Sequence, residues 1–208
     1  DLQKYILENF REENQNKKMV CSILNEKYLE PRAPTGFSFC IPTNGQRPEK
    51  INNLVASVRK QDWNVPYEII VCGDVSSLKL KGKDIKLVDR AEMANTRRVA
   101  SLRNAAADAS KYDTIVFADD DVVLSATWLS DTLKHSQNSG WDVLSNKVLL
   151  PDGGRYWDRA ILSPHIMVDY DHTASDPRLY QSSAFFMVRK HVFENVRWDD
   201  NKLVYADQ

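Results

Sequence analysis

The sequence predicts an α/β fold with a mostly parallel, doubly wound sheet. Short apolar runs that suit buried strands alternate with segments whose apolar residues recur at helical spacing. The predicted strands are Phe37–Ile41, Tyr67–Cys72, Ile85–Val88, Ile115–Ala118 and Ala184–Val188. Strands separated by helices of this length are typical of parallel sheets with helices on both faces. The 208 residues suffice for one such domain with a substantial core.

Composition narrows the class of protein. A hydrophobic content of 42% and a charged content of 27% are ordinary for a soluble globular chain. The net charge of -1 argues against a nucleic-acid partner. No apolar run approaches the roughly 20 residues of a membrane span. Cys21, Cys40 and Cys72 are odd in number and lack metal-site spacing, so we expect reduced, buried thiols and a cytoplasmic protein.

The two ends of the chain suggest a piece of a longer polypeptide. The chain starts at Asp1 rather than Met and stops at Gln208 directly after an apolar-acidic run. We therefore expect further domains, and any attachment to the inner face of a membrane would use regions outside this chain. Residues 1–35 carry helix formers at apolar spacing and predict a helical lead-in or linker. The predicted second unit is 36–208.

The predicted elements between the strands have distinct signals. Residues 42–48 form a turn-rich loop, and the helix after it carries Ile51, Leu54, Val55 and Val58 on one face. Alanine-rich sequence predicts a helix between Asn95 and Ser110. Three further predictions are a helix around 128–134, a strand over 141–150 and a short helix over 189–195. Residues 155–180 predict a long, irregular surface loop, which is usually functional or disordered.

The strand over 115–118 ends in Asp119, Asp120 and Asp121. Ligands of open α/β sheets bind at the carboxyl ends of strands. Three adjacent like charges repel one another, and a bound divalent cation would relieve that repulsion. Mg²⁺ and Mn²⁺ prefer such oxygen ligands. In an extended segment Asp119 and Asp121 would face the same way. An acidic turn or helix N-terminus is the alternative interpretation.

Several segments, taken in order, resemble one family. Residues 39–44 (FCIPTN) resemble the first strand and loop of GT-A glycosyltransferases of the family-2 type. The other matching segments are EIIVCGDVS at 68–76, LRNAA at 102–106, FADDD at 117–121, SSAFFMVRK at 182–190 and WDD at 198–200. FADDD corresponds to the family's DxD motif. The resemblance spans about residues 37–207.

The resemblance implies transfer of a sugar from a nucleoside-diphosphate donor, with a UDP-sugar favoured, to a hydroxyl acceptor. A glycan or lipid-linked acceptor, inversion at the sugar, and a role in surface glycan or polysaccharide synthesis follow by analogy. The implied cofactor is Mn²⁺ or Mg²⁺, bound by Asp121 with Asp119. The implied donor contacts are Pro42, Thr43, Asn44, Arg47, Asp74, Arg103, Asp119 and Asp120. The expected acceptor residues are Tyr156, Trp157, Ser182 and Ser183.

The chain departs from the family pattern at three places. Gly73 replaces the first acid of the second-strand motif, which leaves Asp74 for contact with the nucleotide base. Ser182-Ser183 stands where the family has a glycine pair. For the catalytic base, Asp207 is our candidate, with Ala206 in place of the family's Glu; alternatively the acidic pair lies beyond Gln208.

Other interpretations stay open from sequence alone. Thr43 and Asn44 are also common turn residues. Arg103 has a structural pairing with Asp108 as its rival role, and Asn104 is expected to hold a loop backbone. A sugar nucleotidyltransferase would show a glycine-rich basic loop after the first strand, and an aspartyl phosphotransferase would have its acids there. A non-catalytic sugar-nucleotide-binding module gains weight if the base is absent.

Overall fold

The computed structural model describes residues 29–153, 155–157, 159–163, 166–169 and 184–201. The predicted lead-in lies largely outside these residues, and so do Ser182, Ser183 and Asp207. No helix in the described ranges has the length and apolarity needed to cross a membrane.

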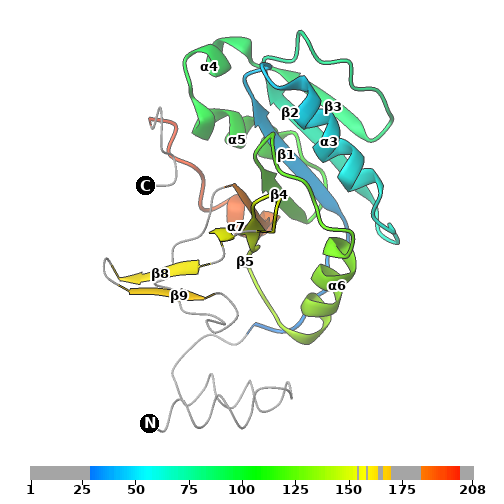
Figure 1. Cartoon of the computed structure of the whole chain (residues 1–208), viewed down its shortest axis with the longest axis vertical. Coiled ribbons are helices and arrows are strands. Elements are labelled where there is room, and N and C mark those ends of the chain that lie inside the picture. The colour runs from blue at the N-terminus through cyan, green and yellow to red at the C-terminus, as the bar shows by residue number, and fades with distance from the viewer. Residues whose placement is uncertain (1–28, 154, 158, 164–165, 170–183, 202–208) are drawn as a thin grey trace, which may run out of the picture.

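A six-stranded sheet forms the centre of the domain (Figure 1). Its order is β3-β2-β1-β4-β10-β5. The bounds are β1 Phe37–Thr43, β2 Tyr67–Gly73, β3 Ile85–Asp89, β4 Thr114–Ala118, β5 Val143–Ser145 and β10 Phe185–Arg189. β1, β2, β3 and β4 are parallel to one another, whereas β10 is antiparallel to both β4 and β5. The predicted mostly parallel α/β sheet is confirmed.

Helices cover both faces of the sheet. The longer ones are α3 Pro48–Arg59, α5 Val99–Asp108 and α6 Trp128–Asn138, and the short ones are α4 Ala91–Asn95 and α7 Lys190–Phe193. The predicted apolar face of α3 packs with α6 on one side, against Phe37, Phe39 and Ile41 of β1. The helices α4, α5 and α7 pack on the other side, against Cys40 and Ile70. Side chains that alternate along buried strands thus feed two cores.

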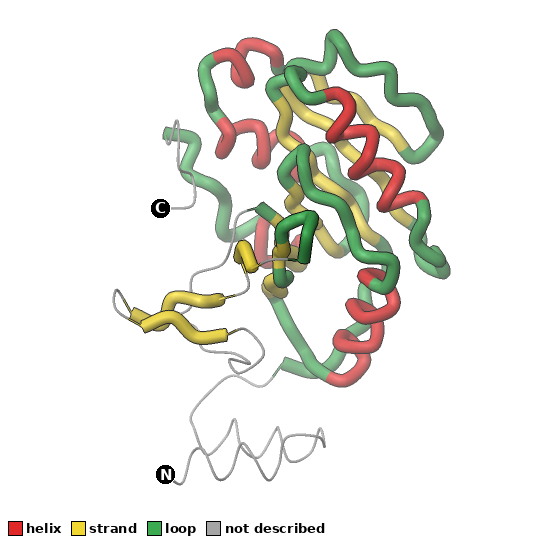
Figure 2. The backbone as a smooth tube through the Cα atoms, in the orientation of Figure 1, coloured by secondary structure: helices red, strands yellow, loops and turns green. Residues whose placement is uncertain are grey.

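Three predicted elements differ from the structure. The helix expected between Asn95 and Ser110 is only α5, because Arg97 adopts a φ of 55° and separates it from α4. The strand over 141–150 is broken into β5 and β6 Val148–Leu149. The expected irregular loop contains β7 Arg155–Trp157, which pairs with β6. It also contains the antiparallel pair β8 Arg159–Ser163 and β9 Ile166–Asp169, outside the main sheet (Figure 2).

The strand order creates a switch point between β1 and β4. From β1 the chain winds outward through β2 to β3, and it then crosses back to place β4 on the other side of β1. The connections leaving the carboxyl ends of β1 and β4 therefore diverge. A crevice at such a point is where open α/β sheets bind ligands.

Candidate active site

Two strand ends meet at the switch point through side chains. The ladder pairs Phe37 with Thr114 and Cys40 with Phe117, and continuing that register places Thr43 opposite Asp120. The Thr43 hydroxyl donates a 2.8 Å hydrogen bond to Asp120 Oδ2. Asp120 is only 3% exposed, so its carboxylate faces inward rather than toward solvent.

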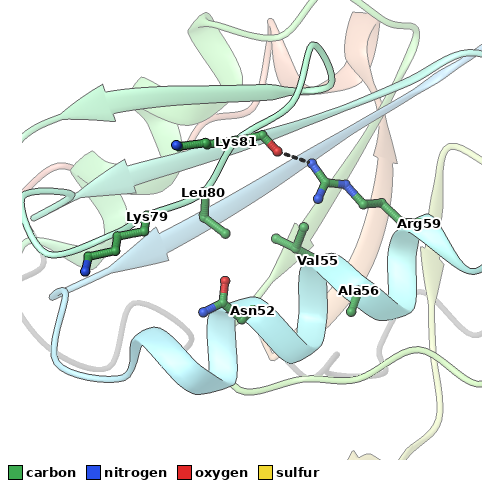
Figure 3. A pocket seen from close by; sticks show the side chains of 7 residues that line it. All are labelled: Asn52, Val55, Ala56, Arg59, Lys79, Leu80 and Lys81. Atoms are coloured by element: carbon green, nitrogen blue, oxygen red, sulfur yellow. Dashed lines mark hydrogen bonds between the residues drawn. The ribbon is translucent and has the colours of Figure 1, made fainter.

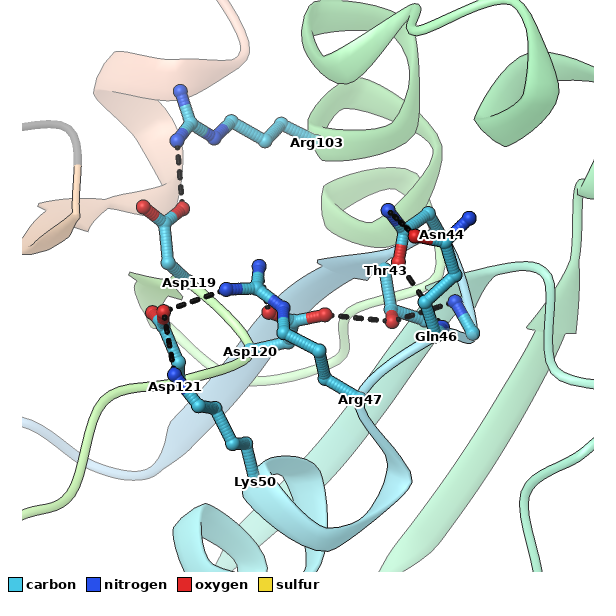
Figure 4. A network of polar contacts seen from close by, with 10 residues as sticks. Thr43, Asn44, Gln46, Arg47, Lys50, Arg103, Asp119, Asp120 and Asp121 are labelled. Carbon is cyan, nitrogen blue, oxygen red and sulfur yellow. Dashed lines mark hydrogen bonds and ion pairs between the residues drawn. The ribbon is translucent and has the colours of Figure 1, made fainter.

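Two cations from the start of α3 approach the acids (Figure 4). Arg47 Nη2 lies 2.6 Å from Asp120 Oδ1, and Arg47 Nη1 lies 2.7 Å from Asp121 Oδ2. Lys50 Nζ lies 3.5 Å from the same Asp121 oxygen. Arg47 caps α3 and Lys50 follows it by three residues, so the first helical turn carries both toward the acidic turn.

The three acids do not continue the strand, because β4 ends at Ala118 and Asp120-Asp121 form a turn. The prediction that Asp119 and Asp121 face the same way was made for an extended segment; here the two side chains are both partly exposed, whereas Asp120 is buried. Asp119 accepts a 3.0 Å bond from Arg103 Nη2 of α5, whereas Asp121 meets Arg47 and Lys50. The backbone holds this turn: Asp119 N donates to Ala184 O at 2.8 Å.

Turn chemistry explains part of the loop after β1. Asn44 Oδ1 accepts from Gln46 N at 3.1 Å, and Thr43 Oγ1 accepts from Gly45 N at 3.1 Å. Pro42 is buried within β1, one residue short of the loop. The loop is thus shaped by its own side chains, and Thr43 also joins it to Asp120.

Backbone packing explains why glycine stands at position 73. Gly73 pairs with Thr43 and has a φ of 140°. A Cβ there would lie 1.9 Å from the Thr43 carbonyl oxygen, so no acid fits at this position. The acid that follows, Asp74, accepts from Ser76 N and Ser76 Oγ at 3.1 and 2.6 Å. These hydrogen bonds lower the pKa of Asp74.

Burial raises the pKa of two acids in the turn. For Asp119 the raised pKa comes from desolvation, which the neighbouring Arg103 guanidinium opposes. For Asp120 desolvation also raises the pKa, against the hydrogen bond from Thr43 and the charge of Arg47. Both carboxylates therefore hold protons more tightly than exposed aspartates do.

The turn fits a hard cation that takes most of its ligands from elsewhere. The side chains of Asp119 and Asp121 are 37% and 35% exposed, so each offers carboxylate oxygen at the edge of the sheet. Asp120 is buried against Thr43. Within the described ranges, no three His, Cys, Asp or Glu residues gather closely enough to enclose a metal. Mg²⁺ commonly binds through one or two carboxylates together with substrate phosphates.

Besides Pro42, Asn44 and Asp74 at the ends of β1 and β2, the predicted residues fall into three groups. The structure brings together Thr43, Arg47, Arg103 and the three acids, as Figure 4 shows. Tyr156 and Trp157 belong to β7, whose backbone alone is described. Ser182, Ser183 and Asp207 lie outside the described residues.

Sequence reasoning missed two participants. Lys50 was detectable, because it follows Arg47 by one helical turn. Trp198 lies under the Arg103 guanidinium, 4.7 Å from it, across a sequence separation that no local pattern reveals. The rival pairing of Arg103 with Asp108 does not form in these residues; Asp108 meets Arg197 at 2.8 Å. Asn104 does hold a backbone, that of Trp198, as predicted.

A separate cavity of about 490 Å³ lies between α3 and the loop from β2 to β3 (Figure 3). Its lining residues are Asn52, Val55, Ala56, Arg59, Lys79, Leu80 and Lys81. Arg59 is held there by the Lys81 carbonyl and by both oxygens of Asp84. None of these residues belongs to the acidic turn, so the candidate site is the sheet edge and not this cavity.

A mostly parallel α/β sheet with an acidic turn at its switch point defines the class of open α/β domains, which bind ligands at the carboxyl ends of their strands. The chain belongs to a particular family within that class, because the profile described as "Glycosyl transferase family 2" matches residues 38–197. Comparison with curated protein sequences finds no match.

Solved structures share the GT-A fold. S. aureus TarS 1-349 superposes with a TM-score of 0.56 at 18% identity, covering 83% of this chain and 52% of TarS 1-349. The mannosyltransferase PcManGT from Pyrobaculum calidifontis, in complex with GDP-Man and Mn²⁺, gives a TM-score of 0.54 at 14% identity, covering 93% of this chain and 56% of its own. The chain thus spans about half the length of these proteins.

Proposed function

We propose that this chain is the donor-binding part of a glycosyltransferase that moves a sugar from a nucleoside diphosphate, a UDP-sugar by preference, to a hydroxyl group. The observation that carries the proposal is the acidic turn at the switch point, where the partly exposed Asp121 stands beside Arg47 and Lys50 and the partly exposed Asp119 beside Arg103. Anionic and cationic groups at one sheet edge suit a diphosphate and its counter-ion.

The donor would bind along the loop after β1 and the acidic turn. Thr43, Asn44 and Asp74 are the proposed contacts for the nucleoside, since they lie at the carboxyl ends of β1 and β2. Arg47 and Lys50 are the proposed contacts for the diphosphate, because a guanidinium donates two parallel hydrogen bonds to phosphate oxygens. Pro42 and Asp120 would act from beneath, by fixing the loop on which these groups stand.

The proposed cofactor is Mn²⁺ or Mg²⁺, held by Asp121 with Asp119 nearby. When bound, such an ion neutralises the negative charge that develops on the leaving diphosphate. Arg103 would keep the Asp119 carboxylate oriented through its 3.0 Å bond. Arg47 would add positive charge on the opposite side of Asp121.

The acceptor side remains a proposal built on the resemblance. A carboxylate there would remove the proton of the acceptor hydroxyl and give inversion at the sugar. Asp207 is the candidate within this sequence, with a residue beyond Gln208 as the alternative. Tyr156, Trp157, Ser182 and Ser183 are the proposed contacts for a glycan or lipid-linked acceptor, in surface glycan or polysaccharide synthesis.

The similar structures support the choice of donors to test. TarS 1-349 was solved in complexes with UDP and with UDP-GlcNAc, and PcManGT with GDP-Man and Mn²⁺. Cys40 and Cys72 are buried and unpaired, which supports a cytoplasmic location of the reaction. We further propose residues 1–35 as a lead-in and 36–208 as the GT-A unit of a longer protein.

Calorimetric titration with UDP, GDP and dTDP, each with and without Mn²⁺, tests the donor site. We expect Mn²⁺-dependent binding of UDP, reduced at least about tenfold by Asp121→Asn because the variant loses a charged ligand. Asp84→Asn is the matched control, since Asp84 also accepts from an arginine but lies away from the turn. Absence of nucleotide binding, or equal binding by Asp121→Asn, contradicts the proposal.

A further inference from the structure

Two consecutive residues of α5 contact two different parts of the protein, the acidic turn and the segment that follows α7. Arg103 and Asn104 are 3% and 5% exposed. Arg103 bonds Asp119 of the acidic turn, and its guanidinium also lies over the ring of Trp198. A single buried cation therefore contacts both the proposed donor site and the segment that follows α7.

Asn104 uses its whole amide group on that segment. Its Nδ2 donates to Trp198 O and to Asp200 Oδ1, both at 2.9 Å. Its Oδ1 accepts from Trp198 N at 3.2 Å. Both backbone polar groups of Trp198 are thereby satisfied by one side chain that lies 94 positions earlier in the sequence.

The Trp198 ring connects this segment to the strands beneath the acids. It packs edge-on against Phe117 of β4 and Phe186 of β10, with ring centroids 5.9 Å apart in each case. Phe117 precedes Asp119 by two residues, and Phe186 pairs with Phe117 across the ladder. Residues 198–200 are thus fixed to the same strand that carries the acidic turn.

We infer that Arg103 and Asn104 are positioning residues that couple nucleotide binding at Asp119 to the placement of residues 198–200. This inference rests on the proposed function. A divalent cation that binds with a nucleoside diphosphate would share the Asp119 carboxylate with Arg103. The guanidinium changes its contact with Trp198 in response, and Asn104 transmits the change because it grips the Trp198 backbone. The placement of residues 198–200 is set when the donor site fills.

Hydrogen exchange of peptides covering 197–201 tests the coupling, with Mn²⁺ alone and with Mn²⁺ plus UDP. In the unaltered chain we expect UDP to change exchange there by about threefold or more. Arg103→Lys keeps a cation for Asp119 but lacks the planar group that stacks on Trp198. At UDP concentrations that saturate each protein, Arg103→Lys should lose the exchange response, and Asn104→Ala should do the same.

Arg197→Gln is the matched control, because Arg197 lies in the same segment but pairs with the exposed Asp108. It should respond as the unaltered chain does. The coupling is overturned if UDP binds without changing exchange in 197–201, or if both Arg103→Lys and Asn104→Ala respond normally. Absence of nucleotide binding by the unaltered chain would instead overturn the proposed function, and the coupling with it.

Discussion

Two buried arginines lie at opposite ends of the sheet and share most of their surroundings. Arg103 and Arg189 are each 3% exposed, and each guanidinium lies over a tryptophan ring, at 4.7 and 3.9 Å. Arg103 meets the carboxyl end of β4 through Asp119, whereas Arg189 meets the amino end of β4 through Thr114. They differ in the partners that satisfy their charge.

The partners of Arg189 belong to the protein interior and its backbone. It donates to Thr114 Oγ1 and to the carbonyl of Arg32, and lies 3.8 Å from Asp113. Arg103 instead pairs with a carboxylate that is 37% exposed at the sheet edge. The comparison teaches that a buried arginine is structural when its partners are enclosed, and available for function when its partner faces solvent.

The largest effect should come from Arg189→Met. Removing the guanidinium leaves the buried Thr114 hydroxyl and the Arg32 carbonyl without this charged donor and removes the contact with the Trp141 ring, which should lower the free energy of unfolding by about 3–5 kcal/mol. Urea unfolding measures this loss. UDP affinity of the folded variant should stay near that of the unaltered chain. A loss below about 1 kcal/mol would break the comparison by making Arg189 dispensable.

Gly73→Ala should have the next largest effect on stability. Gly36→Ala, just before the amino end of β1, serves as the comparison. The Gly73→Ala Cβ would meet the Thr43 carbonyl at 1.9 Å with φ at 140°, so we expect a loss of about 2–3 kcal/mol and weaker UDP binding. The Gly36→Ala Cβ would meet Tyr112 Cδ1 at 2.5 Å and the Pro66 carbonyl oxygen at 3.1 Å, but without the positive φ of Gly73, so a smaller loss of about 1–2 kcal/mol is expected. Thermal unfolding compares the two variants, and equal losses would contradict this ranking.

Arg103→Met should cost less stability than Arg189→Met. Asp119 is partly solvated, so we expect a loss of about 1–2 kcal/mol in urea unfolding, together with UDP binding at least about tenfold weaker. The comparison of the two ends predicts this inversion: the arginine that matters less for folding matters more for the ligand. Arg103→Met that binds UDP normally would remove the functional half of the comparison.

The smallest expected effect is the pH dependence of stability that comes from Asp120 in the acidic turn. Because burial raises the pKa of Asp120, its contribution to stability is present below its ordinary pKa of about 4 and is lost as pH rises through the folded pKa. The stability difference between the unaltered chain and Asp120→Asn should therefore shrink as pH rises from about 4.

Asp74→Asn supplies the opposite sign as a control. The pKa of Asp74 is lowered by its bonds from Ser76, so its contribution is present above its ordinary pKa and is lost as pH falls through the folded pKa. Parallel pH profiles for the two variants, measured by chemical unfolding, would contradict the assignment of Asp120 as the buried acid.

The sequence predicted elements whose pattern is local. The apolar face of α3 and the buried strands β1, β2 and β4 are as expected, because period and composition determine them. The break at Arg97 was not predictable, since a positive φ at arginine has no sequence signal.

For the candidate site, the sequence predicted which strand ends carry the polar residues. Acids after β4 and Thr43 after β1 followed from parallel topology. The different partners of Asp119 and Asp121 did not, because they depend on a turn held by Ala184, far along the chain. The role of Trp198 was not predicted for the same reason, since tertiary contacts bring it to α5.

The antiparallel course of β10 has one more consequence. The carbonyl of Ala184, the residue before β10, accepts from Asp119 N, so the register of β10 fixes the position of the acidic turn. A one-residue slip would exchange Phe185 and Met187 with Phe186 and Val188 between the two cores, and would offer the turn a different carbonyl. The packing of the β10 side chains into the two cores thus determines the position of the acidic turn at the edge of the sheet.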